Sequence, residues 1–307
     1  MPIMKLDHFQ GCLLGLALGD ALGAPFEGGP LERLAWRLIG KTRHGQMRWT
    51  DDTQMSLDIA KSLIINSSIN PDDLARRFAQ SYHWSRGYGP GAARLLKKIA
   101  KGADWRQANR LIFPTGSYGN GAAMRAPVIG LFYFDKPDPL KNAATDSAMI
   151  THAHPLGLEG AVIVAKATAA AVQGSDGLEL IRLAFEDCAH DEFLSRFEMA
   201  MDWLNSKNEA PSKQVAKSLG NGIAATHSCV TAVYLAARFQ KCSFLSMMQF
   251  IKEMKGDVDT ISAMAGAIWG ASRGVQHLPP EHITRLEKYE VLMGVASELH
   301  SEAIKNH

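Results

Sequence analysis

The chain has 307 residues, of which 33 are basic and 31 acidic, and 46% are hydrophobic. A chain of this length can bury a sizeable core, and its nearly balanced charge gives no general attraction to nucleic acid or to an anionic membrane. We therefore expect no direct nucleic-acid partner and no membrane partner. The four cysteines lie far apart and form no Cys-x-x-Cys pair, which argues against a disulfide framework and favours the cytoplasm.

The N-terminal apolar stretch resembles a short signal peptide at first sight. Asp7, His8 and Asp20 flank or interrupt it, however, and its polar residues are not concentrated on the basic side. We therefore interpret the stretch as a helix of the folded protein. By inspection, no segment of the chain has the roughly 18 apolar residues that span a bilayer.

Helical periodicity runs through most of the chain. In Asp52–Ile65, the residues Met55, Ile59, Ala60 and Leu63 recur at helical spacing. The other segments with this pattern are Leu74–Trp84, Ala92–Lys101, Ala143–Ile150, Gly160–Val172, Leu178–Ala189, Phe193–Asn205, Val230–Phe239 and Phe244–Met254. Alternating runs of β-branched residues, which are typical of strands, are almost absent. The sequence therefore predicts an all-α fold.

The polar segment Asn205–Lys217 is predicted to be the most exposed loop. It is too short and too embedded to separate independent domains, and the sequence shows no convincing repeat or low-complexity region. We therefore expect residues 1–307 to form a single domain.

Small residues gather on one face of two predicted helices. On the first helix these residues are Gly11, Gly15 and Gly19. On the helix that follows Thr260 they are Ala263, Gly266, Ala267, Gly270, Ala271 and Gly274. Glycine inside a helix costs about 1 kcal/mol relative to alanine, so such faces predict helices packed backbone against backbone. This packing would hold the acidic starts of helices near one another.

Two helix starts carry more acid than a helix cap requires. Their oxygen-bearing residues are Thr50, Asp51, Asp52, Asp257, Asp259 and Thr260. One such residue suffices to cap a helix, whereas adjacent carboxylates repel each other unless a cation lies between them. Ligand sets made only of oxygen suit hard divalent cations, so the pattern predicts a dinuclear Mg²⁺ site, with Mn²⁺ as an alternative. Asp20 and Glu27, which follow the first helix, are further candidates for a metal ligand or a general base.

Glycine-rich segments supply candidate ligand-binding loops. The segment Gly116–Gly121 can turn backbone N–H groups toward phosphate oxygens, and Gly220–Gly222 has the same character. Phe113 and Tyr118 are placed to stack on a base. His152 is expected to contact the ligand, whereas His154, before Pro155, is interpreted as a loop or cap residue.

Taken together, these segments resemble the ADP-ribosylglycohydrolase family from Gly11 to about Pro279. The ordered motifs that carry the resemblance are Gly11–Glu27, Trp49–Asp52, Arg86–Gly89, Gly116–Arg125, Thr151–Gly160 and Gly220–Gly274. Within the family, the chain is most similar to the ADP-ribosylhydrolase 3 type. The resemblance implies a compact orthogonal helical bundle with two Mg²⁺ ions in a central cleft.

The resemblance also implies roles for individual residues. The metal ligands would be the six oxygen-bearing residues given above, and Glu27, Asp51 and Asp52 would serve catalysis. The substrate-binding residues would be Gly116, Ser117, Tyr118, Gly119, Asn120, His152, Gly222 and Ile223. The chain departs from the family pattern at Val258, His154, His227 and Phe113, the last being one residue out of register with an aromatic residue that stacks on adenine. Choice of acceptor is therefore the less determined feature.

The implied activity is Mg²⁺-dependent hydrolysis of the bond that links ADP-ribose to an acceptor, and the implied partner is an ADP-ribosylated substrate, including protein. An O-linked acceptor is favoured: serine-linked ADP-ribose, poly(ADP-ribose) or O-acetyl-ADP-ribose. The alternatives are cleavage of the N-glycosidic bond to arginine and a non-catalytic protein that binds ADP-ribose. We expect a monomer.

Overall fold

Two helices from opposite ends of the chain pack directly against each other at the centre of the fold. They are α1 (Leu6–Gly23) and α15 (Val258–Arg273) in the computed structural model, which describes residues 5–206 and 209–306. A Cβ atom added to Gly11, Gly15 or Gly19 would lie 2.1–2.3 Å from a backbone oxygen of α15. The two backbones therefore touch, as the small-residue faces predict.

The contact also sets the direction of the pair. Gly11 meets Gly270, Gly19 meets Ser262, and Gly23 meets the backbone of Asp259. The helices are thus antiparallel, and the end of α1 lies beside the start of α15. This arrangement brings the segment after α1 next to the second acidic motif.

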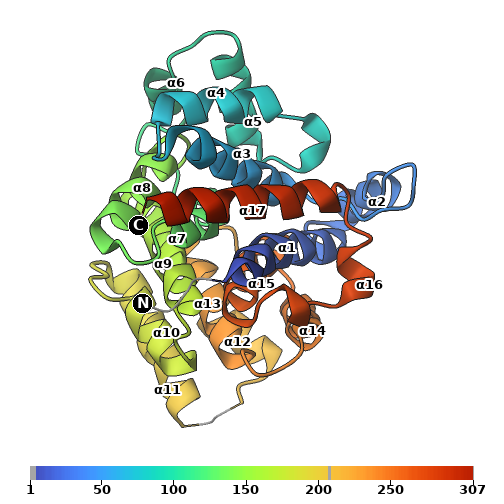
Figure 1. Ribbon diagram of the computed structural model, residues 1–307, viewed down its shortest axis with the longest axis vertical. Helices are drawn as coiled ribbons and strands as arrows, with labels where there is room; N and C mark the ends of the chain where they lie inside the picture. The colour runs from blue at the N-terminus through green and yellow to red at the C-terminus, as the bar shows by residue number, and fades with distance from the viewer. Residues whose placement is uncertain (1–4, 207–208, 307) are drawn as a thin grey trace.

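The remaining helices surround this pair (Figure 1). Those in the first half of the chain are α2 (Pro30–Ile39), α3 (Asp51–Asn66), α4 (Pro71–Ser81), α5 (Pro90–Ala100), α6 (Trp105–Ile112), α7 (Pro127–Phe132) and α8 (Pro137–Met149). Those in the second half are α9 (Pro155–Val172), α10 (Gly177–Ala184), α11 (Asp191–Asn205), α12 (Ser212–Ser218), α13 (Cys229–Arg238), α14 (Phe244–Met254), α16 (Pro280–Ile283) and α17 (Tyr289–Lys305). The 3-10 helices are η1 (Ala24–Phe26), η2 (Trp84–Arg86), η3 (Asn120–Ala122), η4 (Ala225–His227) and η5 (Val275–His277).

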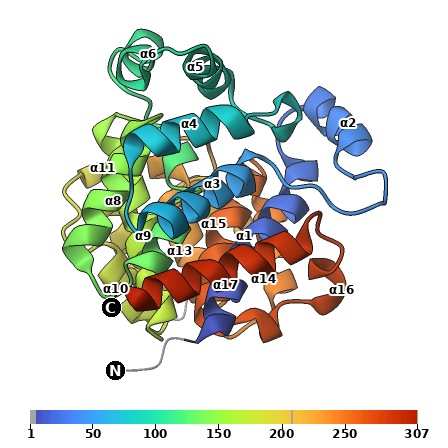
Figure 2. The ribbon, with the colours of Figure 1, turned by 45° about the horizontal axis from the view of Figure 1, so that its top comes forward.

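The described residues contain helices and isolated bridges but no strand, which confirms the all-α prediction. Figures 1 and 2 show α4, α5 and α6 together at one end, while α2 stands apart at the edge of the molecule. None of the residues of α2 is buried. The core is one continuous cluster that draws buried residues from nearly every other helix.

Two predicted helices end earlier in the structure than expected. The helix predicted over Leu178–Ala189 ends at Ala184, and the one predicted to reach Trp84 ends at Ser81. The predicted loop Asn205–Lys217 is partly wrong, because α12 begins at Ser212. Residues 207–208 of that segment lie outside the described residues. The composition of α12 is mostly polar, so the sequence shows no helical hydrophobic pattern there. Its one buried residue, Val215, holds the helix against the core.

Two helices are long and apolar enough to cross a membrane by length and composition, namely Leu6–Phe26 and Pro155–Val172. The expectation that no segment reaches this threshold was therefore wrong. In the most hydrophobic 18-residue stretch of the first helix 78% of the residues are buried inside the fold, and in that of the second helix 67% are buried. Packing within the core accounts for the apolar character of both helices.

The contact between α1 and α15 predicts a sharp difference between two glycine substitutions. A Cβ at Gly270 would lie 2.0 Å from the backbone oxygen of Gly11, so we expect Gly270→Ala to lower the free energy of unfolding by about 1–3 kcal/mol or more. Gly294 in α17 has no atom within 4 Å of the same position. Gly294→Ala should therefore leave stability unchanged or raise it by up to about 1 kcal/mol. Urea unfolding of both variants tests this, and equal stabilities would contradict backbone contact.

Candidate functional site

Carboxylates from three segments converge at the junction of α1, α3 and α15. Oxygen atoms of Glu27, Asp257 and Asp259 all lie within 4.8 Å of one another. Asp51 and Asp52, at the start of α3, line the same cavity, which has a volume of about 290 Å³. Thr260 lines it as well, and its hydroxyl donates to Asp52 Oδ1 at 3.5 Å. The structure thus brings together the two acidic motifs that are far apart in the sequence.

Asp20 holds the first acidic motif in place from behind. Its carboxylate accepts hydrogen bonds from the backbone N–H of Thr50 at 2.9 Å and from the backbone N–H of Thr53 at 3.1 Å. The Thr53 hydroxyl also donates to it, at 2.5 Å. Asp20 is fully buried and does not line the cavity. It is therefore a positioning residue, and Glu27 is the residue of this segment that faces the site.

A second buried contact fixes the residue that precedes this motif. The carboxylate of Glu287 accepts from the backbone N–H of Trp49 at 3.1 Å and pairs with the guanidinium of Arg86. Arg86 also donates to the carbonyl oxygen of Trp49 at 2.6 Å, and its guanidinium lies 3.7 Å from the centre of the indole ring. The start of α3 is thus held by side chains from η2 and from the segment before α17.

The electrostatics of the cluster favour a bound cation. Burial, together with the neighbouring carboxylates, raises the pKa of Asp51, Asp52 and Asp259 well above the usual range. Burial raises the pKa of Asp257 to about 6. Asp52 Oδ2 is buried without a hydrogen-bond partner among the described residues. Buried carboxylates of this kind need a compensating positive charge, and oxygen-only donors fit hard divalent cations.

The two glycine loops pair with each other along the opposite wall. Asn120 N–H donates to the carbonyl oxygen of Ile223 at 2.9 Å, and Ala225 N–H donates to that of Tyr118 at the same distance. Asn120 also donates from its side chain to Asp257 Oδ2 at 2.5 Å. The loops are therefore one unit that is tied directly to the carboxylate cluster.

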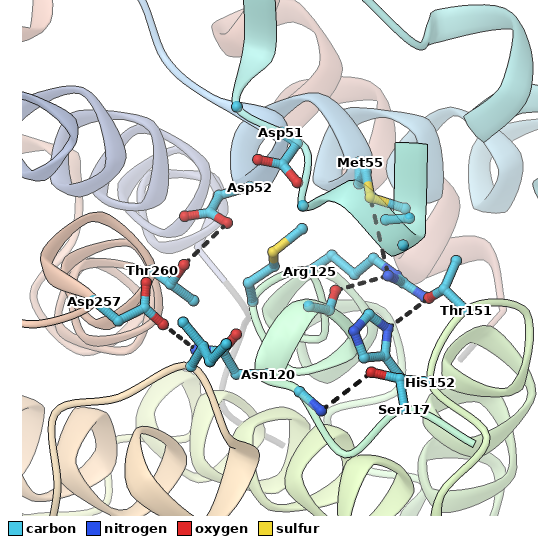
Figure 3. A pocket seen from close by; sticks show the side chains of 18 of the residues that line it. Asp51, Asp52, Met55, Ser117, Asn120, Arg125, Thr151, His152, Asp257 and Thr260 are labelled. Carbon is cyan, nitrogen blue, oxygen red and sulfur yellow. Dashed lines mark hydrogen bonds between the residues drawn. The ribbon is translucent and has the colours of Figure 1, made fainter. Parts of the chain in front are cut away.

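His152 reaches the cavity from a third direction (Figure 3). Its Nδ1 atom lies 2.8 Å from the hydroxyl of Thr151, which in turn accepts from the buried guanidinium of Arg125 at 2.9 Å. Burial lowers the pKa of His152 to about 3, so the ring is neutral. Its Nε2 atom faces Gly119 and Gly121, where it can contact a ligand on the glycine loop.

The predicted binding residues divide between the cavity and its surroundings. Ser117, Gly119, Asn120, His152 and Ile223 line the cavity, as does Phe113, which the register of the motif had left in question. Gly116, Tyr118 and Gly222 lie outside it, with 58% of the Tyr118 side chain exposed. Thr50 lines an adjacent cavity, and its hydroxyl oxygen caps α3 by accepting from Asp52 N–H at 3.3 Å.

The two histidines of unassigned role lie away from the carboxylates. His154 Nδ1 accepts from Leu156 N–H at 3.2 Å and caps α9, as interpreted from the sequence. His227 is exposed beside Gly220 and Gly222. Arg125 is the residue whose position the sequence did not reveal. Its guanidinium is fully buried beside the cavity and donates to backbone carbonyl oxygens, so no acidic partner in the sequence marks it.

In an all-helical fold, the site joins a buried carboxylate cluster to a glycine loop of the kind that binds phosphate. A family model described as ADP-ribosylglycohydrolase matches residues 1–307. The chain belongs to the ADP-ribosylglycohydrolase family, and the predicted family and fold are confirmed.

Individual relatives agree with this assignment. The chain is 33% identical to ADP-ribosylhydrolase ARH3 of Gallus gallus, over 95% of this chain and 92% of that protein. It is 32% identical to ADP-ribosylhydrolase ARH3 of Homo sapiens, over 96% and 93%. A solved structure, the ADP-ribosylglycohydrolase-related protein complex, superposes with a TM-score of 0.74 at 27% identity, over 98% of this chain and 99% of that one.

The raised carboxylate pKa values predict how stabilisation by Mg²⁺ depends on pH. In the metal-free protein, aspartates with a raised pKa bind more protons when folded than when unfolded, so their contribution to stability falls as the pH rises. Mg²⁺ bound to these carboxylates would replace those protons. The rise in melting temperature caused by Mg²⁺ should therefore be small near pH 5 and should reach about 5 °C or more near pH 8.

Thermal melts with excess Mg²⁺ and with chelator, compared at each pH, measure this difference. His152 stays neutral in the folded protein over this pH range, so its contribution to stability is the same with Mg²⁺ and with chelator and cancels. A Mg²⁺ effect of the same size at both pH values would contradict binding by these aspartates.

Proposed function

We propose that this protein is a divalent-metal-dependent hydrolase that cleaves the glycosidic bond between ADP-ribose and an O-linked acceptor. The observation that carries the proposal is the layout of one cavity (Figure 3). Asp51, Asp52 and Asp257 lie at one end, and His152 with Ser117 lies at the other. ADP-ribose has vicinal hydroxyls, a diphosphate and an adenine in sequence, and these groups suit the carboxylate end, the glycine loop and Phe113 in the same order.

The proposed metal ligands are Thr50, Asp51, Asp52, Asp257, Asp259 and Thr260, with Glu27 beside them. These oxygen donors are suited to two Mg²⁺ ions, and oxygen donors are equally suited to Mn²⁺. Bound cations would supply positive charge for the ribose hydroxyls and for a nucleophilic water.

Glu27 is the proposed proton donor and acceptor. Its carboxylate is half-buried, borders the cavity and belongs to the carboxylate cluster. From this position it can protonate the departing oxygen of the acceptor or take a proton from the attacking water. The anomeric carbon acquires oxocarbenium character in such cleavage, and the carboxylates of Asp51 and Asp52 help to stabilise that positive charge.

The diphosphate would be held mainly by uncharged donors. Backbone N–H groups of the paired glycine loops would turn toward the phosphate oxygens, and the neutral ring of His152, in its Nε2–H tautomer, would add a further donor. Phe113 and Ile223 both line the cavity, and the ring of Phe113 can stack on adenine there.

The O-linked acceptor is supported by similarity to proteins named ADP-ribosylhydrolase ARH3 over most of the chain. All four cysteines are free, which supports our placement of the protein in the cytoplasm. The monomeric state stays a prediction.

Release of free ADP-ribose from serine-linked and arginine-linked peptides is the primary test. We expect release from the serine-linked peptide in Mg²⁺ and none in chelator, because the buried carboxylates repel one another without cations. Release from the arginine-linked peptide alone would move the protein to the N-linked alternative. Tight binding of ADP-ribose, with no release of ADP-ribose from either peptide, would favour the alternative of a non-catalytic ADP-ribose-binding protein.

Substitution of Asp259 tests whether this residue is a metal ligand. Asp259→Ala or Asp259→Asn removes one carboxylate from the group that can hold a cation. Changes in residues that only support a metal ligand cost about 10–100-fold, so loss of a ligand should lower activity by at least about 100-fold. Calorimetric titration should show the matching loss of Mg²⁺ affinity, with the exposed Asp146→Asn variant as control. Unaltered Mg²⁺ affinity would exclude Asp259 as a ligand.

A further inference from the structure

A second cavity lies on the other side of Glu27. Its volume is about 250 Å³, and it shares Glu27 and Gly87 with the cavity of the candidate active site. Thr50, immediately before Asp51, also lines it. The second cavity therefore adjoins the carboxylate end of the site.

This position is where the acceptor of ADP-ribose must lie. In the proposed function the ribose occupies the carboxylate end, so the bond to be cleaved points away from the diphosphate loop. Glu27 borders both cavities and is the proposed proton donor to the departing oxygen. A group attached to that oxygen therefore enters the second cavity.

The walls of the second cavity come from α2 and η2 and are tied together. The guanidinium of Arg48 donates to the carbonyl oxygen of Ile39 at 2.8 Å and to the Ser85 hydroxyl at 2.9 Å. Both of these residues line the cavity, whereas Arg48 lies behind the wall and faces Glu287 at 3.9 Å. The helix α2 projects from the body (Figure 2), yet the two hydrogen bonds of Arg48 fasten its C-terminal end to η2.

The lining combines aromatic rings with carboxylates. Trp36 and Trp84 contribute indole rings, and 72% of the Trp84 side chain is exposed. Glu32 adds a carboxylate to that of Glu27, and no lysine or arginine lines the cavity. Indole faces attract cations and cover aliphatic stems, while carboxylates pair with the charged end. This is the chemistry that receives a lysine or arginine side chain.

We propose that the second cavity binds a basic side chain of a polypeptide acceptor, adjacent in that polypeptide to the ADP-ribosylated residue. The inference rests on the proposed function and assigns its substrate class: ADP-ribosylated protein with a lysine or arginine beside the modified residue. Trp84, Trp36 and Glu32 are then acceptor-binding residues and take no part in bond cleavage.

The test compares three substrates: an ADP-ribosyl-serine peptide with lysine next to the serine, the same peptide with alanine in that place, and O-acetyl-ADP-ribose. The wild-type protein should prefer the lysine peptide to the alanine peptide by about fivefold in kcat/KM. Trp84→Ala should remove that preference through KM, with kcat and the hydrolysis of O-acetyl-ADP-ribose unchanged. Glu32→Gln should act in the same direction.

Leu38→Ala is the matched control, because Leu38 is a 79% exposed residue of α2 that does not line the cavity. The control should keep the preference for the lysine peptide. Equal kcat/KM for both peptides in the wild-type protein, or a preference that survives Trp84→Ala, would overturn this inference alone. No release of ADP-ribose from any of the three substrates would overturn the proposed function, and the inference with it.

Discussion

The structure depends on a contact between two helices that have almost no side chains between them. Glycines on α1 face the backbone of α15 so closely that an added methyl group would overlap a carbonyl oxygen. The contact is antiparallel, and this direction places the end of α1 beside the start of α15. Every later feature of the site uses that junction: Asp20 lies in the last turn of the first helix, Asp257 and Asp259 lie at the start of the second, and Glu27 follows η1. A spacer of even one methyl group would separate these carboxylates.

The junction concentrates negative charge that the fold alone does not balance. Asp20 is satisfied by hydrogen bonds from Thr50 and Thr53, so it can stay buried as a fixed support. Asp52 and Asp259 are held among other carboxylates, and burial raises the pKa of both. Helix starts contribute partial positive charge from α3 and α15, but only about half an elementary charge each. The arrangement is therefore stable either with protons at low pH or with cations at neutral pH.

The sequence predicted the parts of the site that are encoded locally. The acidic motifs, the glycine loops and the small-residue faces each lie within a short segment, and all of them meet in the structure as expected. The hydrogen bonds by which Asp20 and Glu287 support the first acidic motif could not be predicted in the same way. Asp20 acts on residues 30 and 33 positions away, and Glu287 pairs with Arg86 across 201 positions. Such partners are chosen by the fold, and a single sequence carries no signal that links them.

The two ends of the site differ in how they are built, and this difference bears on specificity. The proposed diphosphate end consists of paired loops that are tied to the core through Asn120 and through the buried Arg125. The proposed acceptor cavity is lined in part by α2, which has no buried residue and is fastened mainly at Ile39. Changes in the first region disturb the core, whereas changes in α2 alter only an exposed helix. Under the proposed function, the acceptor can therefore be varied through α2 without disturbing the carboxylate cluster, which includes no side chain of that helix.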